Sequence, residues 1–181
     1  MPIFAIMHSI KSHDIIVLLK ILCQRRNNWK FESLQEDLHL SVSAIHRSLE
    51  RCIQAKFISP KPYDDVYILN VSEFLIHGIA YTFAVEPGKI TRGIATAHSA
   101  PPLNKKIISE KDIYVWPYLK GKLRGQSIVP LMKHVPEIVQ HDKSLYEILA
   151  LIDAIRIGRT REKEIAANLL KEKLQYYAGR Y

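Results

Sequence analysis

The sequence predicts an α+β protein that is mainly helical. Two long stretches carry apolar residues at helical spacing, from Ser12 to Ile53 and again from Ser144 to Leu174. Between them lie short runs of β-branched and aromatic residues bounded by turn formers, such as residues 112–118. The 181 residues, of which 48% are hydrophobic, suffice for one ordinary domain or for a small domain with a dependent second half.

Composition excludes several classes of protein. No apolar run approaches the ~18 residues that a membrane-spanning helix needs, so no membrane contact is expected. The apolar N-terminal stretch lacks the basic start and the cleavage site of a secretory signal. Cys23 and Cys52 are too few for a disulfide framework and lack metal-ligand spacing. We expect both to be small buried hydrophobes in a cytoplasmic protein.

The net charge of +8 favours polyanionic partners, and it is unevenly distributed. Residues 1–62 hold nine basic and five acidic side chains, and residues 104–143 hold eight and four. The stretch between them is slightly acidic. The basic excess therefore lies in two separate segments.

The first two expected elements are helices. Ser12 precedes a strongly apolar run that extends to Leu22. A short helix over residues 31–38 follows, with Leu34 and Leu38 four residues apart on one face.

A third helix is expected to begin after Ser41. The Ser41 hydroxyl is placed to accept a hydrogen bond from the backbone near Ala44, which is the usual way of capping a helix. Two helices joined by about three residues have the spacing of a helix-turn-helix. The expected buried face of the third helix is apolar and consists of Ile45, Leu49, Cys52 and Ile53.

After Ala55 the pattern changes from helix to strand. The segments Phe57–Ser59 and Val66–Leu69 predict two short strands around the turn-forming residues 60–65. Three helices followed by a two-stranded hairpin is the element order of a winged helix.

Residues 12–69 resemble the winged helix-turn-helix domain of MarR-type and related bacterial transcriptional regulators. In two positions where many such domains have Gly, this chain has His39 and Lys56. The remaining residues resemble only uncharacterised bacterial proteins and add no activity. The resemblance covers about a third of the chain and is carried by Leu34, Leu38, Leu40, Ser41, Ile45, Arg47, Leu49 and residues 55–58.

The resemblance implies a sequence-specific regulator that binds double-stranded DNA, acts as a homodimer and represses transcription. A recognition helix inserts its N-terminal residues into the major groove, where short polar side chains and Arg suit base contact. We expect base contacts from Ser43, Ala44, His46 and Arg47. We expect phosphate contacts from Ser41, Arg51, Lys56, Lys61, Arg25 and Arg26. Alternatively, the winged helix contacts a protein, such as an enzyme for which this chain is an antitoxin-like or regulatory partner.

Residues 1–70 are expected to form the winged helix-turn-helix domain, and residues 71–181 a region of unknown role. That region would dimerise, and would receive a small-molecule effector or a partner protein. It is expected to contain a helix over residues 72–79, a loop over residues 86–102 and a small basic hairpin over residues 112–125.

The chain is expected to end in a helical hairpin. Ser144–Glu147 matches a capping box for the first of its helices, and Gly158 would stop that helix. Thr160 would cap the last helix.

Two groups of side chains in the second region are candidate anion or ligand contacts. Arg92 and His98 lie in the expected loop, where the alternative is ordinary loop packing. Arg156, Arg159 and Arg161 crowd the junction of the C-terminal helices. For Arg161, at a helix N-terminus, the alternative to a bound anion is an ion pair with Asp153 or Glu162.

The sequence predicts neither an enzyme nor a cofactor site. The eight His are scattered, no acid or Cys completes a metal-ligand set, and no phosphate-binding or nucleophile motif is present.

Overall fold

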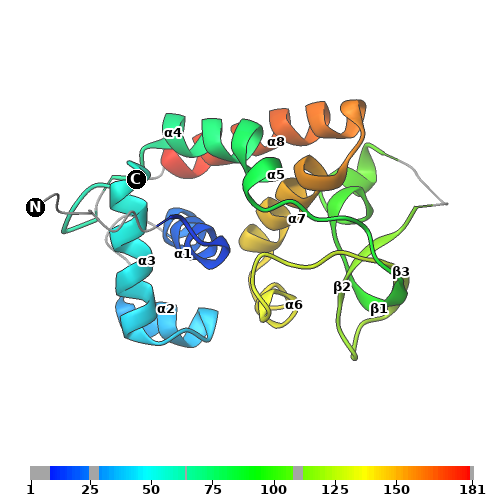
Figure 1. Cartoon of the computed structure of the whole chain (residues 1–181), viewed down its shortest axis with the longest axis horizontal. Coiled ribbons are helices and arrows are strands. Elements are labelled where there is room, and N and C mark those ends of the chain that lie inside the picture. Colours follow the sequence, from blue (N-terminus) through cyan, green and yellow to red (C-terminus); the bar gives the residue numbers. More distant parts are fainter. Residues whose placement is uncertain (1–8, 25–28, 64, 108–111, 180–181) are drawn as a thin grey trace, which may run out of the picture.

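The computed structural model describes residues 9–24, 29–63, 65–107 and 112–179. Helices α1 to α3 lie at one end of the long axis and three strands at the other, with α7 between them and α8 running along one side (Figure 1). The molecule is α+β and mainly helical, as the sequence predicts. The bounds of the main helices are α1 Ser12–Cys23, α2 Phe31–Leu38, α3 Val42–Gln54, α7 Lys143–Ile157 and α8 Thr160–Ala178.

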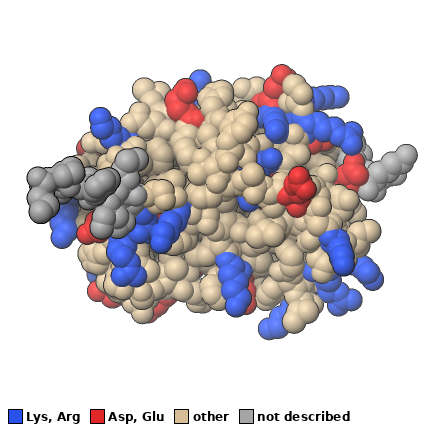
Figure 2. All heavy atoms as spheres, in the orientation of Figure 1, with Lys and Arg blue, Asp and Glu red and all other residues tan. Residues whose placement is uncertain are grey.

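Lys and Arg side chains gather at both ends of the long axis (Figure 2). One end carries α1 to α3 and the other carries the strands. Among the described helices, none combines the length and the hydropathy of a membrane span.

Helices α2 and α3 have the bounds and the turn expected of a helix-turn-helix. His39, at the end of α2, has φ 53° and ψ 38°, which is the left-handed conformation that commonly ends a helix. The Ser41 hydroxyl accepts a hydrogen bond from the Ala44 amide at 3.2 Å and caps α3. The local signals for both helix ends are therefore confirmed.

The prediction of a second wing strand is wrong. Ile58 and Val66 form a single antiparallel bridge, and the chain then enters α4, Ile68–Glu73. Because Val71 and the later Leu75 are buried at helical spacing, packing against the core favours a helix here. The structure therefore holds three helices and one bridge where a complete winged helix was expected.

The helix expected over residues 72–79 is longer at both ends. It continues from α4 through a π-helical turn, Phe74–Gly78, into α5, Ile79–Thr82. The other short helical elements are two 3-10 turns, Ala97–Ser99 and Leu103–Lys105, and α6, Val135–Ile138.

Three strands form a small closed barrel. They are β1 Ile90–Ala95, β2 Tyr114–Pro117 and β3 Leu123–Ser127. Strand β1 pairs antiparallel with both others, while β2 and β3 pair parallel. Two expectations are therefore wrong, since the loop over residues 86–102 contains a strand, and β2 and β3 are not a hairpin.

Glycine explains why the barrel closes so tightly. A Cβ at Gly93 would collide with the Trp116 carbonyl oxygen, and one at Gly125 would collide with the Ile113 carbonyl oxygen. These close approaches exclude any side chain, which is a role that glycine takes inside strands.

The C-terminal helices are capped differently from the prediction. Asp142, not Ser144, caps α7, because its carboxylate accepts a hydrogen bond from the Leu145 amide at 2.9 Å. At α8, Thr160 is already helical, and Glu162 accepts a hydrogen bond from the Arg159 amide at 3.0 Å. The expected helix end at Gly158 is confirmed.

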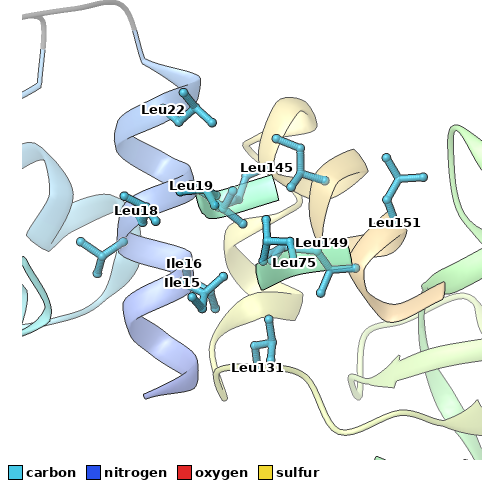
Figure 3. Close-up of a cluster of buried hydrophobic side chains, with 14 of the residues drawn as sticks. Ile15, Ile16, Leu18, Leu19, Leu22, Leu75, Leu131, Leu145, Leu149 and Leu151 are labelled. Atoms are coloured by element: carbon cyan, nitrogen blue, oxygen red, sulfur yellow. The ribbon is translucent and has the colours of Figure 1, made fainter. Parts of the chain in front are cut away.

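One hydrophobic core runs through both halves of the chain. Every residue from Ile15 to Leu22 of α1 is buried, as expected of a helix that is packed on all sides. Leu19 lies beside Leu145 of α7, and Leu75 lies close by (Figure 3). The expected boundary at residue 70 therefore does not separate two hydrophobic cores.

A buried carboxylate joins the barrel to α7. Asp153 accepts hydrogen bonds from the Thr96 hydroxyl at 2.8 Å and the Trp116 indole at 2.6 Å, and pairs with the Arg156 guanidinium at 2.7 Å. Arg156 also donates to the carbonyl oxygens of Phe83 and Val129. Burial raises the pKa of the Asp153 carboxyl, and its three partners oppose that rise. Arg156, a candidate ligand contact from the sequence, is therefore held in a buried ion pair with Asp153.

We expect Asp153→Ala to destabilise the protein strongly. The substitution leaves Thr96, Trp116 and the Arg156 cation buried without their shared partner, which costs about 3–5 kcal/mol. Urea denaturation followed by circular dichroism measures the loss. The exposed Glu172→Ala on α8 is the control and should stay within about 0.5 kcal/mol of wild type. A loss of similar small size for Asp153→Ala would contradict the role given to this carboxylate.

Candidate nucleic-acid interface

Helix α3 has one buried face and one exposed polar face. Ile45, Leu49 and Cys52 are fully buried against the rest of the protein. Ser43 and Arg47 are exposed, and Ala44 is half-buried. The N-terminal half of α3 thus presents small polar side chains and one guanidinium to the outside.

The N-terminus of α3 suits the approach of an anion. Besides capping the helix, the Ser41 hydroxyl lies 3.2 Å from the Ser43 hydroxyl. The first turn contains no acidic residue that would neutralise the positive end of the helix dipole. Hydroxyl donors and backbone amides at such an end are typical phosphate contacts.

An aromatic groove lies beside α3, formed by Trp29, Phe31, His46 and Tyr63. The His46 ring stacks on Phe31 with a centroid distance of 4.1 Å. Trp29 meets Phe31 edge to face at 5.3 Å. The groove is open to solvent, has a volume of about 780 Å³ and is also lined by Lys30, Glu32, Lys61 and Pro62.

The groove changes the role expected for His46. Because its ring is held against Phe31, His46 shapes the groove instead of projecting freely from α3. Sequence reasoning missed Trp29, Phe31 and Tyr63. The available signal was an aromatic pair around Lys30, just ahead of the α2 apolar pattern.

Two of the expected phosphate contacts, Lys56 and Lys61, are exposed lysines. Lys56 follows α3 with φ 56°, and its carbonyl oxygen accepts a hydrogen bond from the Asn70 side chain at 2.7 Å. Lys61 lies on the edge of the aromatic groove. Arg25 and Arg26 lie outside the described residues.

Arg51 is not available for phosphate, which corrects the sequence prediction. Its guanidinium donates to both carboxylate oxygens of Asp14, at 2.6 and 2.7 Å, and both side chains are buried. The side chain lies on the face of α3 that packs on α1, so it joins these two helices. A buried cation paired in this way serves the fold and not an external anion.

Of the candidate ligand residues of the second region, the structure brings His98 and Arg159 together at Asp112, and it places Arg92 separately on β1. His98 is buried, with its Nε2 2.7 Å from the Asp112 carbonyl oxygen. Arg159 is exposed and lies 3.8 Å from the Asp112 carboxylate. Arg161 is exposed at the start of α8. Arg92 is exposed on β1, opposite Arg124 of β3.

The described residues show little sign of metal or thiol chemistry. Among them, no group of three or more His, Cys, Asp or Glu is arranged to hold a metal ion. Burial raises the pKa of the Cys23 thiol to about 12, and it also raises that of Cys52. Neither thiol is therefore ionised near neutral pH.

Comparison with protein-family models, with curated proteins and with solved structures finds no match to this chain.

We expect Ser41→Ala to destabilise the protein by about 1 kcal/mol, because the Ala44 amide loses its capping acceptor. Ser43→Ala is the matched comparison, since it removes an exposed hydroxyl two residues away that contacts the Ser41 hydroxyl but accepts no backbone hydrogen bond in the described structure. Chemical denaturation of both variants measures the difference. Equal stability of the two would show that the cap contributes nothing.

Proposed function

We propose that this chain is a sequence-specific regulator that binds double-stranded DNA through α3 and represses transcription as a homodimer. The observation that carries the proposal is the exposed polar face at the N-terminal half of α3. It combines Ser41, Ser43 and Arg47 with a helix end free of acidic residues, while the opposite face is fully buried.

In this proposal α3 lies in the major groove. The small side chains of Ser43 and Ala44 let the helix approach the base edges closely. The Arg47 guanidinium is suited to the paired O6 and N7 acceptors of guanine. Arg47 is therefore proposed as the main source of sequence preference.

Phosphate contacts would add affinity without sequence information. Ser41 at the helix N-terminus, Lys56 and Lys61 are exposed around α3 and are proposed for this role. Arg51 is left out because Asp14 occupies its guanidinium. A homodimer is proposed because two recognition helices read half-sites about one helical turn apart, which a single α3 does not reach.

The aromatic groove favours a second candidate function, contact with a protein. Aromatic side chains and Arg are enriched in the centres of protein interfaces. A groove with several rings beside Lys30 and Lys61 would suit an apolar, partly acidic segment of a partner. In this case the chain would act as the regulatory partner of an enzyme.

We expect Arg47→Ala to weaken binding to the preferred DNA site by about 1–3 kcal/mol, roughly 5- to 150-fold, because a paired base contact is lost. Mobility-shift titration with DNA from upstream of the chain's own gene measures this. Lys171→Ala is the matched control, since it also removes one exposed positive charge but lies on α8.

Equal affinities of Arg47→Ala and wild type would contradict the assignment of α3 as the recognition helix. The protein-contact alternative would be favoured if wild type shifts no DNA and copurifies stoichiometrically with the product of a neighbouring gene. A steep salt dependence with one preferred site would favour the regulator.

A further inference from the structure

The barrel places two arginines of like charge side by side. Arg92 on β1 is the direct cross-strand partner of Arg124 on β3 in an antiparallel pair. Side chains at such positions lie on the same face of the sheet, and like charges there are destabilising. Both arginines are exposed, and neither has an ion-pair partner among the described residues.

Three further basic side chains lie on the same part of the chain. Lys89 precedes β1, and Lys120 and Lys122 lie in the connection between β2 and β3. In residues 84–92 and 117–127 the only acidic side chain is Glu86. We call Arg92, Lys120, Lys122 and Arg124 the barrel basic face and leave out Lys89, because side chains three residues apart on an extended segment point to opposite sides. Figure 2 shows Lys and Arg gathered at the barrel end of the molecule.

The backbone under the two arginines is held in place. Gly93 follows Arg92, and Gly125 follows Arg124, and both glycines are packed directly against backbone carbonyl groups of the barrel. The pairing of β1 with β3 keeps the two arginines opposite each other, so the side chains can relieve the repulsion between their guanidinium groups by rotating apart. An external polyanion would also relieve it.

We propose that the barrel basic face binds the phosphodiester backbone of double-stranded DNA, as a contact separate from α3. The basic side chains are exposed along strands and a turn, which suits an extended polyanion that runs across the surface. The face lies at the opposite end of the long axis from α3 (Figure 1). Contacts of this kind add affinity equally for every sequence.

The test uses Arg92→Ala/Arg124→Ala in the full chain and a random-sequence duplex of about 40 base pairs, with affinity followed by fluorescence anisotropy at several salt concentrations. Loss of two phosphate contacts should make the slope of log affinity against log salt shallower by about 1.8, since each contact contributes about 0.9. Affinity at low salt should also fall.

Lys163→Ala/Lys171→Ala is the matched control, because it removes the same net charge from exposed positions on α8. Its slope should equal that of wild type. Arg92→Lys/Arg124→Lys keeps the charge and should also keep the slope. An unchanged slope in the alanine pair would overturn the proposal, and so would an equal change in the α8 control. An unchanged slope is also the result expected if the face binds an acidic protein instead of DNA.

Two further measurements distinguish the loss of phosphate contacts from unfolding and from the loss of sequence preference. Because the alanine pair removes a repulsion, its midpoint of urea denaturation should not fall below that of wild type. The alanine pair should weaken binding to preferred and random DNA by the same factor, whereas Arg47→Ala should lower the preference itself. Failure of the barrel proposal is thus distinguishable from failure of α3 as the recognition helix.

Discussion

The Asp153 carboxylate sets the relation between the barrel and the helices. A carboxylate in a fully buried position needs charged or hydrogen-bonding partners. Asp153 takes them from the end of β1, from β2 and from its own helix, through Thr96, Trp116 and Arg156. Arg156, which pairs with Asp153, also donates hydrogen bonds to the carbonyl oxygens of Phe83 and Val129. Since α7 also packs on α1, this group contributes, together with the hydrogen bond from the Tyr146 hydroxyl to the Ala95 carbonyl oxygen, to the placement of the strands relative to the helices.

The sequence predicts those parts of the fold that depend on residues close together in the chain. Apolar spacing and Ser41 locate α2 and α3, because helix formation and capping depend on residues within one turn. The barrel depends on pairing between distant segments. Gly93 is typical of a loop when seen alone, and only the close approach of the Trp116 carbonyl explains it. Ile68 and Leu69 suit either a strand or a helix until the packing of the later Leu75 decides.

In the candidate interface, too, the sequence predicts the exposure of some residues but not the role of others. The exposure of Ser43 and Arg47 follows from helical periodicity relative to the buried Ile45 and Leu49. The role of Arg51 does not, because it depends on Asp14 in α1, which lies 37 residues away. The aromatic groove likewise combines residues from before α2, from α3 and from beyond it. Periodicity assigns a side chain to a face of its helix, but the neighbouring elements decide whether that face reaches solvent.

The burial of α1 on all sides means that the proposed DNA-facing part is not an interchangeable cassette. One side of this helix supports α3, and the other belongs to the core built by α7 and α8. A protein that exchanged residues 1–70 for another reading module would have to rebuild the inner surface of its C-terminal helices at the same time. Helix α1 contacts both α7 and α3, so these two helices are joined through a packed element rather than through a linker.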